Sequence, residues 1–434
     1  MRVEQFKIKN FRGISEMNLV FDQSLNVFSG VNGAGKSSIL DALATMLSWA
    51  TARIRRFNAS GRQMSELDIK NGISSSILKI SASLSERKAE WVLSKTRKGR
   101  RKPDVISNYV SLNDAAQHIQ QQIEESGERC SIPLIAYYPI NRVVSDIPLR
   151  IRNKHDFNLL EAYDHSLSGG TNFRTFFEWF RNREDLENEH GIQKAFRESG
   201  LALPEDWEYP DRQLEAVRRA LGSLMPNFSN LSIQRDPLRM VVVKNGQSLW
   251  VNQLSDGEKC LIAMVGDLAR RLAIANPTHP TPIEGSGVVL IDEIDLHLHP
   301  SWQRMIVPRL RETFSNCQFF ISTHSPQVLG EVDPKNVWFL HQDKQSLEIS
   351  YTKPEQAFGL NSCELLEEYM ESNRRNIDVD HRLTEIFSLI DNEQYDQAKV
   401  KIERLKKDVH GSIPDLVKAE TMITIYDDKE ELAG

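Results

Sequence analysis

The sequence predicts an α/β fold in which a mixed β-sheet is joined by an antiparallel β subdomain, a helical insertion and a C-terminal helical appendage. Three observations predict this fold. Short β-rich apolar runs at 288–291 and 318–321 are typical of central parallel strands, and the segment between them has a helical pattern. Residues from about 155 to 235 are mostly helical in pattern. After about residue 365 the chain changes to charged amphipathic helices.

The N-terminal part supplies the strands. The first 50 residues have the pattern of strand, turn, strand, glycine-rich loop and helix. Residues 51–75 are polar and rich in arginine, which predicts a loop or irregular structure. Residues 77–84 and 91–93 alternate as strands do, and residues 132–139 have the pattern of a buried strand bounded by prolines.

Two patterns define the middle of the chain. Four phenylalanines recur at helical spacing, and we expect them to face the core rather than to form an aromatic ligand box. They are Phe173, Phe176, Phe177 and Phe180. Further on, Asn245-Gly246 separates two β-rich runs at 240–243 and 249–251, which predicts a hairpin with a type I′ turn.

The C-terminal appendage has the pattern of three helices, marked by apolar stripes from Leu383, from Tyr395 and from Leu416. Such stripes must pack on something: a partner protein, one another in a small self-contained bundle, or a second copy of the chain. The predicted organisation is a first half of a nucleotide-binding domain, a helical insertion, the second half of that domain and the helical tail. The expected bounds are 1–150, 151–235, 236–365 and 366–434.

The composition is that of a folded protein with a large core, since 40% of the 434 residues are hydrophobic and 26% are charged. The net charge of −6 excludes binding of nucleic acid through overall charge, so a contact with DNA would need a local patch. No apolar run has the length of a membrane span, and the N-terminus does not resemble a signal peptide. The four cysteines lie far apart. We therefore expect a cytoplasmic protein with reduced thiols.

The most specific motif is the run GVNGAGKS at residues 30–37, which matches the G-x-x-x-x-G-K-S pattern of a phosphate-binding loop. Its glycines allow successive N–H groups to point at phosphate oxygens, and the following helix adds a partial positive charge. Lys36 is expected to reach the β- and γ-phosphates, and the Ser37 hydroxyl to bind Mg²⁺. The residues expected to contact the nucleotide are Asn32, Gly33, Ala34, Gly35, Lys36, Ser37 and Ser38.

An acidic pair, Asp292 and Glu293, follows the buried run at 288–291. Asp292 at the end of a strand is suited to hold Mg²⁺, directly or through water. Glu293 is suited to orient and deprotonate an attacking water molecule. The alternative is that two acidic residues merely cap the end of a strand. The phosphate-binding loop favours the catalytic interpretation.

A second candidate anion site is the segment LSDGE at 254–258, which comes just before a helical run. A helix that starts with a hydroxyl and a glycine can bind an anion. The residues of this segment expected to contact the nucleotide are Ser255, Gly257 and Glu258. The alternative is an ordinary capping box between Ser255 and Glu258.

Three histidines follow the acidic pair. His324 comes just past the strand at 318–321, and this position suggests a contact with the γ-phosphate. His297 and His299 are two residues apart, which could indicate a metal site. No third ligand lies nearby in the sequence, so a turn between two nucleotide sites explains them better.

The order of these motifs resembles that of the ABC-type ATPases of the SMC, RecF and OLD-like group: Walker A loop, LSDGE signature, Walker B acids, D-loop and switch histidine. The segment KNFRGI at 9–14 is similar to one common in RecF-like and OLD-like members. In that group two heads pair face to face, which implies homodimers or higher oligomers, bound ATP and Mg²⁺. The resemblance implies that Ser255 and Gly257 act in trans on a partner's ATP. The residues implied to act in cis are Lys36, Ser37, Asp292, Glu293 and His324.

The sequence departs from the group at the Q-loop. The strand at 134–140 is similar to the one that normally ends in a glutamine that contacts Mg²⁺, but Asn141 stands there instead. Asn141 is therefore the expected Q-loop residue, and Gln63 is an outside candidate.

Within the group, the chain resembles the PtuA ATPases of Septu-type and retron-associated anti-phage (antiviral) defence systems. It has no long heptad arms, and no second acidic cluster follows His324, so we expect no cohesin-like arm and no nuclease of its own. The resemblance implies a partner HNH nuclease, PtuB, bound through the C-terminal helices and released or licensed on infection. The alternative functions are a free-standing RecF-like DNA-repair ATPase and a nucleotide-binding scaffold without turnover. A contact with DNA or with a retron RNA–DNA hybrid would involve the basic run at 95–102. The alternative interpretation of this run is a solvated loop without a ligand.

Overall fold

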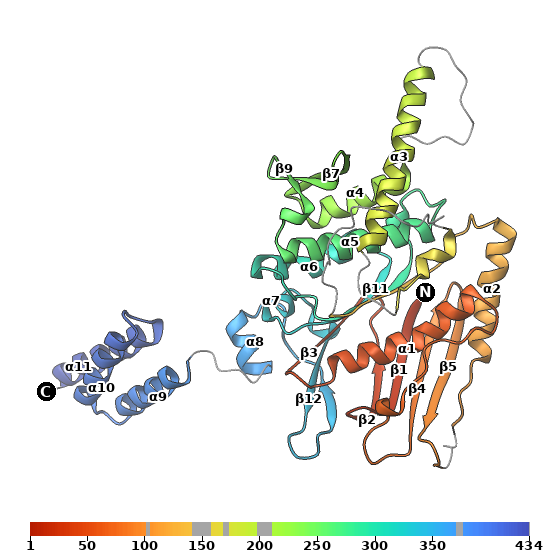
Figure 1. The fold of residues 1–434 in the computed structure, drawn as a ribbon. Coiled ribbons are helices and arrows are strands. Elements are labelled where there is room, and N and C mark those ends of the chain that lie inside the picture. Colours follow the sequence, from red (N-terminus) through yellow and green to blue (C-terminus); the bar gives the residue numbers. More distant parts are fainter. Residues whose placement is uncertain (101–104, 141–157, 168–172, 198–210, 370–375, 434) are drawn as a thin grey trace. The chain divides into compact units, whose positions relative to one another are not determined.

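The computed structural model describes residues 1–100, 105–140, 158–167, 173–197, 211–369 and 376–433, drawn in colour in Figure 1. The chain divides into two compact units, Met1–Ser362 and Cys363–Gly434. Asn141, the residue expected in the Q-loop, lies outside the described residues.

The first unit is built on a six-stranded sheet with the order β13-β12-β3-β11-β10-β6. Five of these strands are parallel to their neighbours, and β13 (Ile349–Thr352) is antiparallel to β12. The parallel strands are β3 (Leu25–Gly30), β6 (Leu134–Tyr138), β10 (Gly287–Ile291), β11 (Cys317–Ser322) and β12 (Val337–Gln342). Every residue of β3, β6, β10 and β11 is buried, which explains their continuous apolar sequences and confirms the predicted central strands. The carboxyl ends of parallel strands lie at the same edge of the sheet.

Helices cover this sheet (Figure 1). They are α1 (Lys36–Arg55), α5 (Asp256–Ala275), α6 (Pro300–Thr313) and the short α7 (Pro326–Leu329).

The prediction that residues 51–75 are loop was wrong at its start, because α1 continues to Arg55. Arg53 is buried there: its guanidinium lies 5.6 Å from the ring of Trp49 and donates hydrogen bonds to Asn58 and Asn113. A polar sequence thus continues the helix because its arginine has partners.

A separate antiparallel sheet with the order β2-β1-β4-β5 forms the predicted β subdomain. Its strands are β1 (Arg2–Phe11), β2 (Ile14–Val20), β4 (Ser75–Leu84) and β5 (Arg87–Thr96), and α2 (Val110–Ser126) packs on β5. Buried residues alternate along β4, which is the pattern of a sheet with one face toward the core.

The middle of the chain begins with two helices, α3 (Phe173–Arg197) and α4 (Arg212–Leu224). All four phenylalanines of the stripe on α3 are buried, which confirms the core interpretation. The ring of Phe176 lies directly over Gly266 of α5, where an added Cβ would come within 2.6 Å of it.

The segment up to residue 235 is not helical to its end, because β7 (Phe228–Arg235) pairs with β8 (Leu238–Lys244). The predicted hairpin of β8 and β9 (Gln247–Trp250) is confirmed. Asn245 and Gly246 have φ angles of 50° and 81°, as a type I′ turn requires. β7 is a strand because it completes a three-stranded sheet with this hairpin.

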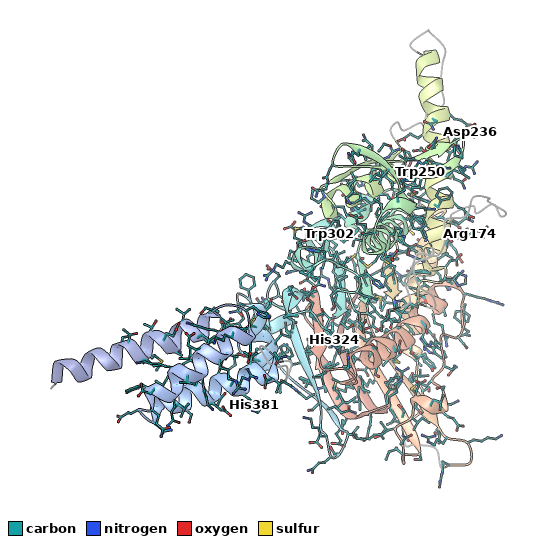
Figure 2. The ribbon with its side chains drawn as sticks, turned by 60° about the vertical axis from the view of Figure 1, so that its left-hand side comes forward. Arg174, Asp236, Trp250, Trp302, His324 and His381 are labelled. Atoms are coloured by element: carbon teal, nitrogen blue, oxygen red, sulfur yellow. The ribbon has the colours of Figure 1, made fainter. Side chains whose placement is uncertain are left out.

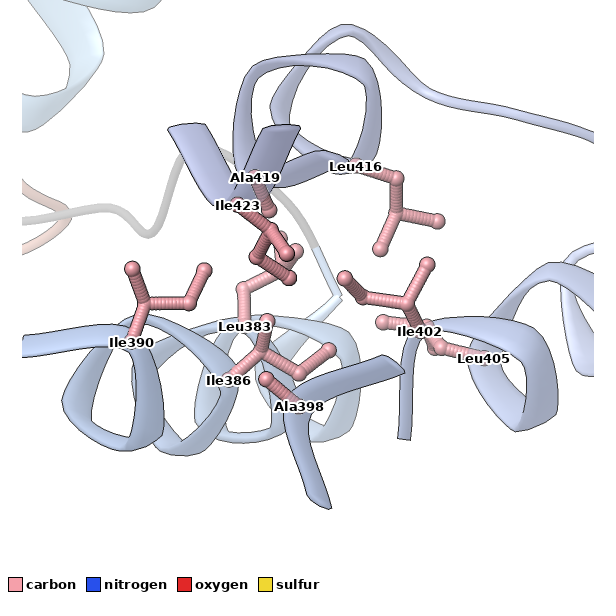
Figure 3. Packing of buried hydrophobic residues seen from close by; sticks show 9 residues of the cluster. All are labelled: Leu383, Ile386, Ile390, Ala398, Ile402, Leu405, Leu416, Ala419 and Ile423. Carbon is pink, nitrogen blue, oxygen red and sulfur yellow. The ribbon is translucent and has the colours of Figure 1, made fainter. Parts of the chain in front are cut away.

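The second unit contains α8 from residue 363 onward (Ser362–Tyr369), α9 (Ile377–Asp391), α10 (Tyr395–Asp408) and α11 (Pro414–Ala433). The predicted apolar stripes of α9, α10 and α11 pack on one another (Figure 3). The core residues are Leu383, Ile386, Ile390, Ala398, Ile402, Leu405, Leu416, Ala419 and Ile423. Of the alternatives for these stripes, the self-contained bundle is the one observed. None of the helices in the described part of the chain combines the length and the apolar character that a membrane crossing requires.

Candidate nucleotide site

The glycine-rich loop links β3 to α1 at the carboxyl edge of the sheet, as predicted. Gly30, Gly33 and Gly35 have φ angles of 140°, 84° and 95°, which only glycine adopts without strain. Asn32 and Gly33 are exposed, whereas Ala34 is buried. The loop therefore has the sharply curved backbone that can turn N–H groups toward a phosphate.

Lys36 lies folded back into this loop. Its Nζ donates hydrogen bonds to the carbonyl oxygens of Gly30 and Val31, at 2.9 and 3.1 Å. Burial lowers the pKa of Lys36 to about 8, although Glu293 and Asp292 oppose this shift. The ammonium group is thus held at the place where phosphate oxygens could replace the two carbonyls.

The Ser37 hydroxyl and the Asp292 carboxylate meet next to Lys36. Ser37 Oγ donates a hydrogen bond to Asp292 Oδ1 at 3.1 Å. Two adjacent oxygens in an octahedral Mg²⁺ shell with bonds of about 2.1 Å are about 3 Å apart. The separation and chemistry of this oxygen pair therefore fit a shared magnesium ion.

The acidic pair is fixed by a residue that sequence reasoning missed, Ser322 at the end of β11. Its hydroxyl accepts a hydrogen bond from the backbone N–H of Glu293 at 2.7 Å and donates one to Asp292. Glu293 has a φ of 47°, a left-handed conformation that turns the chain away from β10. The acidic pair thus has a defined position that depends on the neighbouring strand.

The switch histidine, His324, follows β11 by two residues and is half-buried (Figure 2). Burial and the nearby Lys36 lower the pKa of His324, so its imidazole is neutral at neutral pH. The segment is held by Asp295, which accepts hydrogen bonds from Thr323 Oγ1 at 2.6 Å and from the N–H of His324 at 3.4 Å. The D-loop, which is the run DLHLHP at 295–300, and the switch segment at 323–324 are therefore one hydrogen-bonded unit.

A network of side chains near the loop was missed by sequence reasoning. Arg12, in the NFR segment, has a φ of 48° and pairs with Asp41 at 2.9 Å and with Asp68 at 3.0 Å. The Tyr137 hydroxyl donates to Asp41 as well, at 3.1 Å. Asp41 lies in the second turn of α1, so this network links the antiparallel sheet, the phosphate-loop helix and β6.

The LSDGE segment forms the N-terminus of α5. The capping box is present: Glu258 accepts from both the N–H and the hydroxyl of Ser255, at 3.0 Å each. Lys244 on β8 holds the other Glu258 oxygen at 2.7 Å. Ser255 itself is exposed, so the helix start faces outward with its hydroxyl at the surface.

Gly257 contacts the D-loop of the same chain. A Cβ at Gly257 would lie 2.1 Å from the carbonyl oxygen of His297, which has a φ of 63°. On α6, which follows the D-loop, the ring of Trp302 meets the ring of Phe228 edge to face, with 6.3 Å between the ring centroids. Trp302 is labelled in Figure 2, as is Trp250 at the end of β9. The signature and the D-loop are thus in direct backbone contact.

Two other sequence interpretations are clarified by the contacts. His299 caps α6, because its Nδ1 accepts from the N–H of Ser301, and no group of three metal-ligating side chains is found among the described residues. In the basic run, the Arg97 guanidinium donates to the carbonyls of Ile73 and Ile69, at 3.0 and 2.9 Å. Arg97 therefore stabilises its own loop. Arg101 and Lys102 lie outside the described residues, and Gln63 is exposed.

The low pKa of Lys36 gives a pH-dependent prediction. Below about pH 8 the lysine is charged both with and without nucleotide. Between about pH 8 and pH 10.5, the ordinary pKa of a lysine, Lys36 is mostly neutral in the free protein, but bound phosphates restore its charge. ATP binding should therefore take up nearly one proton at about pH 9, and its affinity should fall up to about tenfold per pH unit in this window.

Calorimetry in buffers of different ionisation enthalpy measures this uptake at about pH 7 and about pH 9. A Lys36→Arg variant is the control, since arginine keeps its charge throughout. Equal proton uptake at the two pH values would contradict the prediction.

The loop, the acidic pair and the switch histidine at the carboxyl edge of a parallel sheet define the class of the protein: it is a P-loop ATPase of the ABC type. A family model described as "AAA domain, putative AbiEii toxin, Type IV TA system" matches residues 25–330, and the chain belongs to this family.

Curated relatives of the chain include proteins of retron and Septu systems. The chain is 31% identical to the "Retron Ec83 probable ATPase" of Escherichia coli, over 86% of this chain and 77% of the relative. It is 30% identical to the "Retron Vc95 probable ATPase" of Vibrio cholerae, over 79% and 74% of the two chains. It is 26% identical to the "Septu protein PtuA" of Bacillus mycoides, over 82% of this chain and 42% of the relative.

Proposed function

We propose that the chain is the ATP-hydrolysing subunit of an anti-phage defence system, and that it regulates a partner HNH nuclease of the PtuB type. The observation that carries the ATPase part is the hydrogen bond between Ser37 and Asp292, beside Glu293, next to a glycine-rich loop whose carbonyls hold Lys36. The similarity to retron and Septu ATPases supports the defence role.

In the proposed reaction, water attacks the γ-phosphorus of ATP, the bond to the β–γ bridging oxygen breaks, and ADP and phosphate leave. Glu293 accepts the proton of the attacking water, while Lys36 and the loop N–H groups bind the β- and γ-phosphates. His324 donates a hydrogen bond to the γ-phosphate. Ser37 and Asp292 would hold Mg²⁺, which supplies positive charge opposite the phosphates.

The proposal places the signature of one chain over the ATP of another in a head-to-head dimer. Support comes from the α5 N-terminus, where Ser255 is exposed and the first-turn N–H groups carry the partial positive charge of the helix. Ser255 must exchange its Glu258 partner for a phosphate oxygen, and Lys244 keeps the Glu258 carboxylate paired when it does so.

The HNH partner is proposed to bind the C-terminal bundle. Its apolar stripes are already buried, so the contact must use what remains at its surface. Val400 and Val417 are 70% and 51% exposed, on α10 and α11. Exposed apolar side chains on a rigid bundle are suited to anchor a partner.

Co-expression of the full chain with the neighbouring HNH nuclease tests the partner. We expect the two proteins to purify together, and Val400→Glu with Val417→Glu to reduce recovery of the nuclease at least about tenfold. Thr421→Glu, an exposed change on α11, is the matched control. Failure of the wild-type pair to purify together would contradict the nuclease role and would favour the RecF-like alternative. Equal recovery with every variant would contradict the binding surface.

A further inference from the structure

A pocket of about 560 Å³ lies at the far end of α1 from the phosphate-binding loop. Its polar lining includes Ser48, Arg55, Ser60, Arg62, His165 and Ser166. We propose that this pocket binds a phosphate group carried by a nucleotide or a nucleic-acid strand. It is distinct from the ATP site, because Ser48 to Arg55 follow Lys36 by 12 to 19 residues of helix, roughly 18–28 Å along the axis.

One wall of the pocket is a loop that is fixed to α1 by its backbone. The carbonyl of Arg62 accepts a hydrogen bond from Trp49 Nε1 at 3.0 Å, and its N–H donates to Ser48 Oγ at 2.6 Å. Gly61 is so close to the helix that a Cβ would lie 2.5 Å from the backbone nitrogen of Trp49. The exposed Arg62 is thus carried by a fixed backbone, as a preorganised anion site requires.

The opposite wall is the segment after the 3₁₀ helix Leu159–Tyr163. Ser166 is fixed by its carbonyl, which accepts from the N–H of Tyr137 at 2.6 Å. Ser166 is 4% exposed, and its buried hydroxyl has no hydrogen-bond partner among the described residues. A buried hydroxyl without a partner is costly unless a ligand supplies one.

The charges of the pocket select an anion. Asp164 is paired with Arg55 at 2.6 Å, so these two charges offset each other. The Arg62 guanidinium makes no ion pair with the described part of the chain. It lies close enough to Tyr137 to oppose the rise in the pKa of that residue, which burial causes. A planar guanidinium with free donors matches the geometry of a phosphate group.

The size of the pocket sets the scale of the ligand. Its volume lies within the range of about 300–1,000 Å³ that is usual for small-molecule sites. One nucleotide fits such a space. The shared chemistry is therefore a phosphate group, presented by a free nucleotide or by one unit of a strand that continues outside the pocket.

Fluorescence anisotropy on the full chain tests this site, in a Lys36→Ala background that removes phosphate binding at the ATP loop. The probes are fluorescent AMP and a labelled, 5′-phosphorylated single-stranded DNA 12-mer. We expect at least one probe to bind, and Arg62→Gln to weaken its binding about tenfold and to reduce the dependence on salt by about one phosphate contact. Arg62→Lys should restore part of the loss.

The matched control is Arg56→Gln, an exposed arginine on the same helix end that does not line the pocket. It should leave binding unchanged, and thermal unfolding should show both variants folded. AMP binding that depends on Arg62 identifies a free nucleotide, and DNA binding without AMP binding identifies a strand. The proposal is overturned if neither probe binds, or if Arg62→Gln and Arg56→Gln have equal effects.

Discussion

Replacing Glu293 with glutamine is expected to lower ATP turnover by about 10²–10⁴-fold and to leave ATP binding intact, because the variant keeps the shape of the side chain but loses the general base. The backbone of residue 293 is held by Ser322, and this contact does not involve the changed group. The loop that holds the phosphates is separate from this position. ATP-bound protein should therefore accumulate in paired form, which light scattering can detect.

The matched control is Glu312→Gln, an exposed glutamate at the end of α6. It should turn over ATP at the wild-type rate. Turnover and phage protection that both persist in Glu293→Gln would show that Glu293 is not the base. Phage protection without measurable turnover in the wild-type chain would favour the scaffold alternative.

Gly257→Ala is expected to lower turnover by about 10²-fold or more, because displacing a reacting group by about 1 Å has effects of this size. The added Cβ would stand 2.1 Å from the His297 carbonyl oxygen, so either the signature or the D-loop must move. ATP binding should persist, since the cis loop is untouched. Turnover and titration with a fluorescent ATP analogue measure the two effects separately.

Gly222→Ala is the control for this change. Gly222 lies inside α4, and a Cβ there meets nothing within 4 Å. We expect unchanged turnover and a small gain in stability from the better helix former. Wild-type turnover in Gly257→Ala would contradict the role of the signature–D-loop contact.

The sequence was sufficient for the parts of the fold where burial is complete. The strands β10 and β11 are apolar at nearly every position, and the phosphate loop between β3 and α1 has a fixed pattern. The end of α1 was missed because Arg53 looks solvent-exposed until Trp49 and Tyr109 surround it. β7 was missed because its strand character depends on pairing with β8.

The residues of the candidate site that depend on contacts between distant segments could not be predicted from the sequence either. Asp292 and Glu293 could be located because they follow a buried strand, but Ser322 could not. Its role exists only because β11 is the neighbour of β10, and that strand order is a property of the fold. The network of Arg12, Asp41 and Tyr137 joins three distant segments for the same reason.

The most direct test of the account is a mixing experiment with two inactive variants. Lys36→Ala removes the phosphate-binding lysine, and Ser255→Arg blocks the exposed signature without touching the D-loop of its own chain, so each alone should have little turnover. If the site is shared between two chains, half of the dimers in an equal mixture are mixed and carry one intact site each. We therefore expect about a quarter of the wild-type rate in the mixture. A mixture that stays as inactive as its two components would contradict a site shared between chains.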